Sequence, residues 1–190
     1  MMKIFAETER LILREMTQED AESFFEMDSK PEVHRYLGNK PVESLQQTID
    51  VIEFVRQQYI DNGIGRWTLI EKASGDYVGW GGLKLIREDT KNIVDYLDVG
   101  YRLTPKHWNK GYATESAIAS VKYGFEKLKH SMIYATAHKE NKASRHALEK
   151  TGLMCTDDHD WEGIPCDWFE ISFETWKEKH SFKTSNILLF

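Results

Sequence analysis

One stretch of the chain joins a predicted strand to a predicted helix through a glycine, and this junction limits the possible folds more than any other feature. Residues 93–103 alternate between apolar and polar side chains, which is typical of a strand with one buried face. From Ala113 to Phe125 an apolar residue recurs at every fourth position, which predicts an amphipathic helix. Gly111 stands at the start of that helix. Because the first N–H groups of a helix have no partner inside it, we expect this junction to bind an anion such as phosphate.

The charge balance argues against some classes of partner. The 190 residues include 25 Lys and Arg against 31 Asp and Glu, a formal net charge of −6. Such a protein is a poor match for nucleic acid and suits an amine substrate better, although solubility alone also explains the charge. The charged start and the absence of a long apolar run predict a cytoplasmic protein with no membrane segment. The two cysteines form no disulfide framework, and their surroundings match no zinc pattern, so we expect no metal.

The remaining sequence alternates between strand and helix signals without an internal repeat or a linker. A capping-box pattern at Thr17–Asp20 opens one helix, and a longer helix begins at about Ser44 and is ended by Gly63. Strands are predicted at 11–16, 67–70, 77–80, 93–103 and 132–137, from Leu153 onward, and at 168–173. Helices are predicted after Thr17, at 44–62, at 113–128 and at 141–150. This order indicates an α/β or α+β fold, with a mixed sheet covered by helices on both faces. We expect one domain over residues 1–177 and a tail over 178–190.

Two motifs resemble the acetyl-CoA-binding core of the GNAT superfamily of N-acetyltransferases. The first is Trp108–Glu115, which reads Trp-Asn-Lys-Gly-Tyr-Ala-Thr-Glu, and the second runs from Asn141 to Gly152. Segments 8–14 and 98–101 resemble the first and fourth strands of the same family, so the resemblance extends over about the whole chain to residue 177. Within the superfamily the closest likeness is to the branch that includes the ribosomal-protein alanine acetyltransferases. The resemblance implies a single GNAT-like domain whose mixed, mostly antiparallel sheet splays between its fourth and fifth strands.

The same resemblance implies a function and a binding site. The chain is expected to transfer an acetyl group from acetyl-CoA, its co-substrate, directly to a primary amine. The loop amides would hold the pyrophosphate, the backbone of the fourth strand would pair with the pantetheine arm, and an Asn would hold the far end of that arm. The coenzyme-binding residues implied are Tyr101, Arg102, Leu103, Trp108, Asn109, Lys110, Gly111, Tyr112, Ala113, Thr114, Asn141 and Ser144.

The sequence departs from the family pattern at the expected general acid. Many members carry a Tyr four residues before the Gly that ends the second motif, where it protonates the leaving thiolate, and this chain has Leu148 there. Ser144 is the nearest hydroxyl on the same helix and is our substitute, but a Ser in the first turn of a helix also commonly bonds to the backbone. The missing Tyr favours the alternative that the chain is an acyl-CoA-binding sensor or regulatory module without turnover.

Asp98 is the candidate general base. It stands where relatives often have a Glu, and the attacking amine must lose a proton before or during the reaction. The alternative is that Asp98 only pairs with Arg102, four residues further along the chain on the same strand face. His138 is the next candidate base, and His34 is a candidate residue of the acceptor site. The sequence leaves open whether the acceptor is a protein N-terminus or a small amine, and whether the protein is a monomer or a homodimer.

Overall fold

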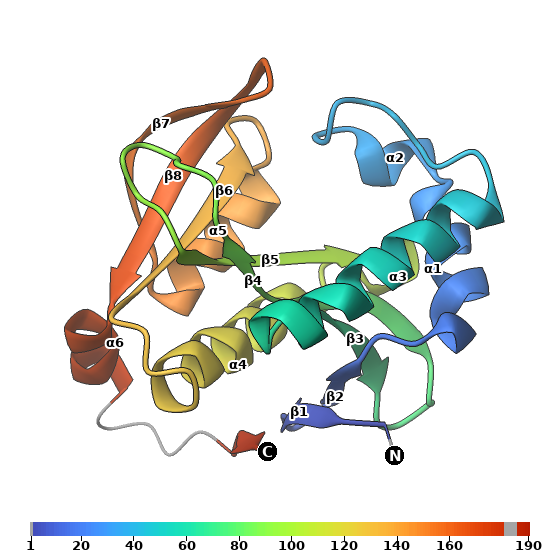
Figure 1. The fold of residues 1–190 in the computed structure, drawn as a ribbon, viewed down its shortest axis with the longest axis horizontal. Helices are drawn as coiled ribbons and strands as arrows, with labels where there is room; N and C mark the ends of the chain where they lie inside the picture. The colour runs from blue at the N-terminus through green and yellow to red at the C-terminus, as the bar shows by residue number, and fades with distance from the viewer. Residues whose placement is uncertain (1, 181–185) are drawn as a thin grey trace.

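A mixed sheet of nine strands forms the centre of the part of the chain that the computed structural model describes, residues 2–180 and 186–190 (Figure 1). The strands lie in the order β7-β8-β6-β5-β4-β3-β2-β1-β9. Only β5 and β6 pair in parallel, which confirms the expected mixed, mostly antiparallel sheet. Their bounds are β1 Ile4–Glu7, β2 Leu11–Glu15, β3 Arg66–Glu71, β4 Tyr77–Ile86, β5 Tyr96–Leu103, β6 Met132–His138, β7 Met154–Trp161, β8 Ile164–Ser172 and β9 Leu188–Leu189.

Helices cover both faces of the sheet, as expected. One hydrophobic core lies between α4 and the strands, and a second lies between the opposite face and α1 with α3. Figure 1 shows α3 and α4 as two separate helices that run diagonally across the view. The helices are α1 Ala21–Asp28, α2 Pro31–His34, α3 Leu45–Asn62, α4 Tyr112–Glu126, α5 Lys142–Thr151 and α6 Phe173–His180. No helix among the described residues is long and apolar enough to cross a bilayer.

Local sequence signals account for where several helices begin and end. The Ser44 hydroxyl accepts from the backbone N–H of Gln47, whose side chain bonds back to the Ser44 N–H, so α3 starts with a capping box. The helix ends at Gly63, whose φ of 70° is left-handed and suits glycine. Thr17 and Asp20 form a second capping box before α1. These observations confirm the predicted helix boundaries.

The two ends of the chain form more of the sheet than the sequence predicted. Ile4–Glu7 forms β1, which pairs with β2 and, on its other side, with β9. Residue 177 lies within α6, and residues 181–185 of the expected tail lie outside the described residues. The division of the chain at residue 177 therefore stays a prediction.

The expected splay lies between β5 and β6. These strands pair only at Leu97↔Ile133 and Asp98↔Tyr134. Beyond that point β5 continues to Leu103 and β6 to His138 without pairing to each other. Residues 99–103 and 135–138 therefore line the two arms of a V, and the N-terminal end of α4 follows directly after the β5 arm.

Candidate active site

The loop before α4 presents backbone donors at a helix N-terminus. Gly111 is the N-cap residue with a φ of 84°, and Asn109 is also left-handed, with a φ of 60°. Asn tolerates this conformation better than most residues, which explains how a residue other than glycine can occupy this position. Within the described residues, the N–H groups of residues 109–114 donate to no backbone or side-chain acceptor. A run of unpaired N–H groups at a helix N-terminus is suited to a phosphate group.

Arg10 holds this loop in place through hydrogen bonds, a role that the sequence alone did not indicate. Its guanidinium donates to the carbonyl of Lys110 at 2.9 Å and to Glu115 at 2.7 Å, and it lies 4.4 Å above the ring of Tyr112. The Thr8 hydroxyl donates to the other carboxylate oxygen of Glu115 at 2.6 Å. Glu115 alone would place a negative charge in the first turn of α4, close to the expected anion. Arg10 neutralises that charge and adds a cation beside the loop.

Replacing Arg10 with Ala should weaken acetyl-CoA binding about tenfold, measured by titration calorimetry. Hydrogen bonds to charged groups contribute about 1.5–3 kcal/mol, and the lower value applies because the Arg10 side chain is 41% exposed. Arg87→Ala is the matched control, since it removes an exposed arginine whose ion pair with Asp95 is remote from the loop. Equal affinities in the two variants would show that Arg10 does not support coenzyme binding.

The second motif begins at the N-cap of α5. The side-chain oxygen of Asn141 accepts from the Ser144 N–H at 3.1 Å, and its amide nitrogen donates to no described residue. Ser144 Oγ lies 3.2 Å from the hydroxyl of Tyr101, which donates to the Ser144 carbonyl at 2.9 Å. Among the described residues Ser144 Oγ has no bond to the helix backbone, so the alternative structural role expected for it is not observed. Burial raises the pKa of Tyr101 to about 12, against the opposing effect of its bond to Ser144.

A hydrogen bond connects the end of β5 to the loop before α4. The side chain of Arg102, an expected coenzyme-binding residue, points away from the splay. The indole N–H of Trp108 donates to the carbonyl of Leu103 at 2.8 Å, which holds the loop against the strand. Arg102 extends its side chain to the opposite face of the sheet, where it donates to Asp28 at 2.6 Å and lies over the ring of Trp80. The side chain of Arg102 therefore does not face a coenzyme in the splay, and its backbone lies opposite Trp80 of β4.

Asp98 pairs with Arg66, so the expected Asp98–Arg102 pair was wrong. Arg66 comes from β3, two strands away, and its guanidinium also donates to the carbonyls of Gly82 and Asp98 at 2.6 and 2.7 Å. A Cβ at Gly100 would lie 2.8 Å from this guanidinium, so the glycine leaves the space through which Arg66 reaches Asp98. Burial raises the pKa of Asp98, and the charge of Arg66 opposes that shift.

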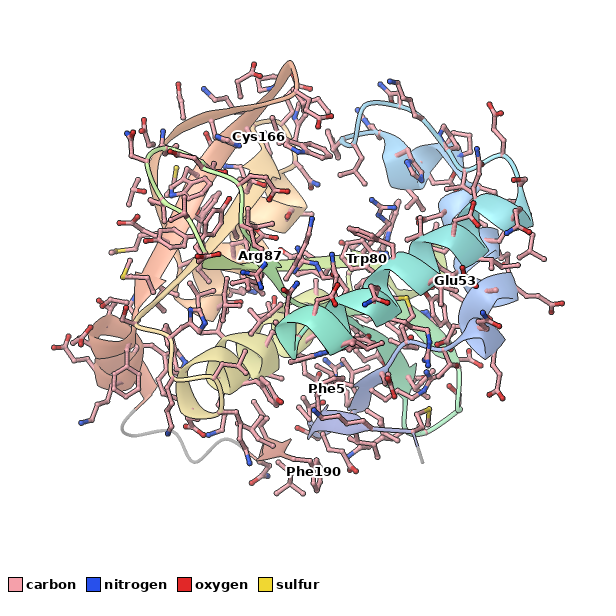
Figure 2. The ribbon with its side chains drawn as sticks, viewed as in Figure 1. Phe5, Glu53, Trp80, Arg87, Cys166 and Phe190 are labelled. Carbon is pink, nitrogen blue, oxygen red and sulfur yellow. The ribbon has the colours of Figure 1, made fainter. Side chains whose placement is uncertain are left out.

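The chain after α2 crosses the open end of the V. The ring of Tyr36 lies 5.2 Å from that of His138, the last residue of β6. A Cβ at Gly38 would lie 3.5 Å from the side chain of Ile164, which begins β8. We call residues 35–43 the strap; Figure 1 shows it reaching from α2 toward β6 and β8. Figure 2 labels Trp80 on β4 and Cys166 on β8, which lie well apart in this view.

The two histidines near the strap differ in their surroundings. His34 is 5% exposed, and its Nε2 lies 4.0 Å from Asp28, while burial and then the charge of Arg102 lower its pKa. The Nδ1 of His138 accepts from the Glu140 N–H at 3.0 Å. His138 is therefore held with its other nitrogen available, whereas His34 anchors the start of the strap.

One group of side chains has the spacing of metal ligands. Single ligand atoms of Glu71, Asp76 and His107 all lie within 4.8 Å of one another. Each of these residues already has a partner, because Glu71 bonds to the Tyr112 hydroxyl, Asp76 pairs with a lysine at 3.0 Å, and His107 lies 2.6 Å from a threonine hydroxyl. These contacts account for the group, and we assign it no metal.

Comparison with known proteins gives the same family as the geometry. Residues 10–154 match the family described as the acetyltransferase (GNAT) domain. The chain is 34% identical over 148 residues to the protein named uncharacterized N-acetyltransferase YoaA of Bacillus subtilis, covering 78% of this chain and 81% of that protein. A GNAT-family acetyltransferase from Bacillus anthracis is 25% identical with a TM-score of 0.75, and the match covers 90% of this chain and 99% of that one.

A further solved structure shares the fold at lower identity. The spermidine N-acetyltransferase of Vibrio cholerae, solved in complex with CoA and spermine, has a TM-score of 0.71 and 18% identity, covering 87% of this chain and 97% of that one. GNAT enzymes use acetyl-CoA as their co-substrate. The match to the family domain extends over most of the chain and includes the loop before α4 and the N-terminal turn of α5. This protein is therefore an acetyltransferase of the GNAT family.

Proposed function

We propose that this enzyme transfers the acetyl group of acetyl-CoA directly to a slender primary amine, without a covalent enzyme intermediate. The observation that carries the proposal is the run of unpaired N–H groups at residues 109–114, at the end of the β5 arm of the V. The pyrophosphate binds at these donors, and Lys110 and Arg10 supply positive charge nearby. The pantetheine arm then lies in the V, where it pairs with those backbone groups of residues 101–103 that point away from β4.

Two side chains complete the binding of the arm. The amide nitrogen of Asn141 is left to donate because its oxygen already caps α5. Ser144, one turn into the same helix, lies beside the arm. With the thioester at the point where β5 and β6 stop pairing, the strand N–H groups near Val99 polarise its carbonyl as the amine attacks.

Asp98 takes the proton of the amine, directly or through water. Its raised pKa makes it a better base than an exposed carboxylate, and Arg66 fixes its orientation through three hydrogen-bonded oxygens. The amine approaches from the face of the sheet that carries Asp98 and Trp80, opposite α4. His138 is the alternative base, at the far end of the β6 arm.

The strap supports a slender acceptor. It connects α2 to the ends of β6 and β8, so an amine reaching the V must pass beside it or beneath it. A small amine fits this requirement, as does a flexible N-terminal segment of a protein, whereas a folded surface does not. The spermidine acetyltransferase with the same fold supports the first choice, and the resemblance to the ribosomal-protein branch supports the second.

Adding acetyl-CoA should raise the melting temperature of the protein. A ligand at one hundred times its Kd stabilises the folded state by about 2.7 kcal/mol. ADP is the matched control, since it carries a pyrophosphate without a pantetheine arm and should give a smaller shift. Neither heat nor a thermal shift at millimolar acetyl-CoA would contradict the proposed site.

An acceptor screen then distinguishes an enzyme from a sensor. Free thiol release would be followed with polyamines, with peptides bearing a free N-terminus, and with the same peptides blocked at the N-terminus. Release with polyamines or free peptides, and none with blocked peptides, is the expected result. Tight acetyl-CoA binding without thiol release for any amine would favour the regulatory alternative.

A further inference from the structure

We propose that the Tyr101 hydroxyl stabilises the thiolate of coenzyme A as it leaves, in place of the tyrosine that is absent at position 148. This inference rests on the proposed function and adds a residue on β5 to the reaction. The sequence motifs implied only a backbone role for Tyr101 and gave no reason to connect its side chain with α5. The structure shows its hydroxyl 2.9 Å from the carbonyl of Ser144 and 3.2 Å from the Oγ of that residue.

The position of this hydroxyl matches that of the missing one. Ser144 and Leu148 are four residues apart on α5 and therefore lie on one face of the helix, one turn apart. Long side chains in a helix point back toward its N-terminus and cover the preceding turn. A tyrosine at 148 would thus place its hydroxyl over the turn that contains Ser144. Tyr101 brings a hydroxyl to the same turn from the opposite side, across the V.

Leu148 leaves this space to Tyr101. Its side chain is 1% exposed and belongs to the core between α4 and the sheet, and the ring of Tyr101 packs against that same core. The ring of Tyr101 is therefore held by apolar contacts, while its hydroxyl reaches the polar first turn of α5. Leu148 fills its place in this core, and Tyr101 supplies the hydroxyl that a tyrosine at 148 would otherwise provide.

The hydroxyl is able to change partners without moving the ring. The Ser144 carbonyl lies inside α5, where it also accepts from the N–H four residues later, so the bond from Tyr101 is additional. Rotation about the C–O bond of the phenol redirects its proton from this carbonyl to a sulfur in the V. Ser144 Oγ is then placed to donate to the phenol oxygen and to hold it in that orientation.

The step balances without transfer of the phenol proton. The amine nitrogen bonds to the thioester carbonyl carbon, and the C–S bond then breaks with its electron pair staying on sulfur. The amine proton goes to Asp98. Because burial raises the pKa of Tyr101 to about 12, and a free thiol has a pKa of roughly 8.5, the phenol keeps its proton and stabilises the thiolate by a hydrogen bond.

Tyr101→Phe tests this role because it removes the hydroxyl and keeps the ring. The main measurement is the pKa of the thiol of bound coenzyme A, followed by the ultraviolet absorbance of the thiolate. We expect this pKa to be lower in the wild-type complex than for free coenzyme A, and to rise in Tyr101→Phe. We expect kcat for acetyl transfer to fall about tenfold to hundredfold, with the affinity for acetyl-CoA little changed.

Three further variants separate the effect of the hydroxyl from the effect of ring packing. Tyr123→Phe is the matched control: Tyr123 is a buried tyrosine of α4 that contacts Phe5 and Trp67, and its loss of a hydroxyl should leave the thiol pKa unchanged. Adding Leu148→Tyr to Tyr101→Phe should restore part of the lost rate. Ser144→Ala should reduce turnover modestly, because it removes only the group that orients the phenol.

The possible outcomes are distinct. A wild-type thiol pKa that equals that of free coenzyme A, or one that Tyr101→Phe does not change, would overturn this role and leave the acetyltransferase function intact. A shift in Ser144→Ala alone would assign the hydrogen bond to Ser144 and also overturn it. Failure of the wild-type protein to bind coenzyme A would contradict the proposed function itself.

Discussion

Replacing Asp98 with Asn should lower kcat for acetyl transfer about 10²- to 10⁴-fold and leave the affinity for acetyl-CoA little changed. The amide cannot accept the amine proton, whereas the coenzyme contacts proposed for the loop and Asn141 remain. In the wild type, the rate should fall as the pH is lowered through the pKa of Asp98, because protonation removes the base. Burial raises this pKa, so the loss of rate should begin at a higher pH than for an exposed aspartate.

A matched control is needed because Asp98→Asn leaves Arg66 partly buried with a neutral partner, which costs stability whatever the catalytic role. Asp20→Asn makes the same change in the buried Arg14–Asp20 pair, on β2 and before α1. The melting temperatures of the two variants should decrease by similar amounts. Only Asp98→Asn should also lower turnover and abolish the fall in rate at acidic pH. Equal turnover in Asp98→Asn and wild type would return Asp98 to a structural role and make His138 the next candidate.

Gly111→Val should weaken acetyl-CoA binding about a hundredfold or more, measured by calorimetry. Valine is strained at a φ of 84°, by about 1–3 kcal/mol, and relief of this strain requires the loop to move. Its Cβ would also lie 3.3 Å from the guanidinium of Arg10, and its side chain would block the approach of a phosphate to the backbone.

Gly163→Val provides the comparison for this variant. Gly163 has the same φ of 84°, in the turn between β7 and β8, and a Cβ there meets nothing within 4 Å. The two variants therefore carry similar backbone strain, and only Gly111→Val alters the anion site. Equal loss of affinity in both would mean that general destabilisation, and not the loop, controls binding of the coenzyme.

The parts of the fold that could be predicted from sequence are those with a local cause. The capping box at Thr17 and the helix end at the left-handed Gly63 are each determined within a few residues, and the structure confirms them. At Ser44 the sequence predicted only the start of a helix, and the structure adds its capping box. The strands at the chain ends were missed because their pairing is not local. Leu188–Leu189 is too short to show a periodicity, and it is a strand only because β1 lies beside it.

The candidate site divides in the same way. The loop and the N-cap of α5 were predicted from motifs that are continuous in sequence. Arg10 and Arg66 were missed because their partners are distant: Glu115 is 105 residues from Arg10, and Asp98 is 32 residues from Arg66. The expected pairing of Asp98 with Arg102 followed from their spacing on one strand. In the structure, the guanidinium of Arg66 fills the space left by Gly100 and pairs with Asp98 instead. The spacing of residues along one strand does not show which distant side chain fills such a space.

The V between β5 and β6 also affects how resistant the enzyme is to unfolding and proteolysis. The two halves of its sheet share only two residue pairs, and residues 99–103 and 135–138 pair with β4 and β8 on their other edges. The backbone groups that face the V therefore have no strand partner until a molecule enters it. With acetyl-CoA placed as proposed, the sheet is completed at the start of each catalytic cycle and opened again at its end. The protein is then least stable between turnovers, and a shortage of acetyl-CoA exposes more of the population to proteolysis. Supply of the co-substrate would thus set the abundance of the enzyme as well as its rate.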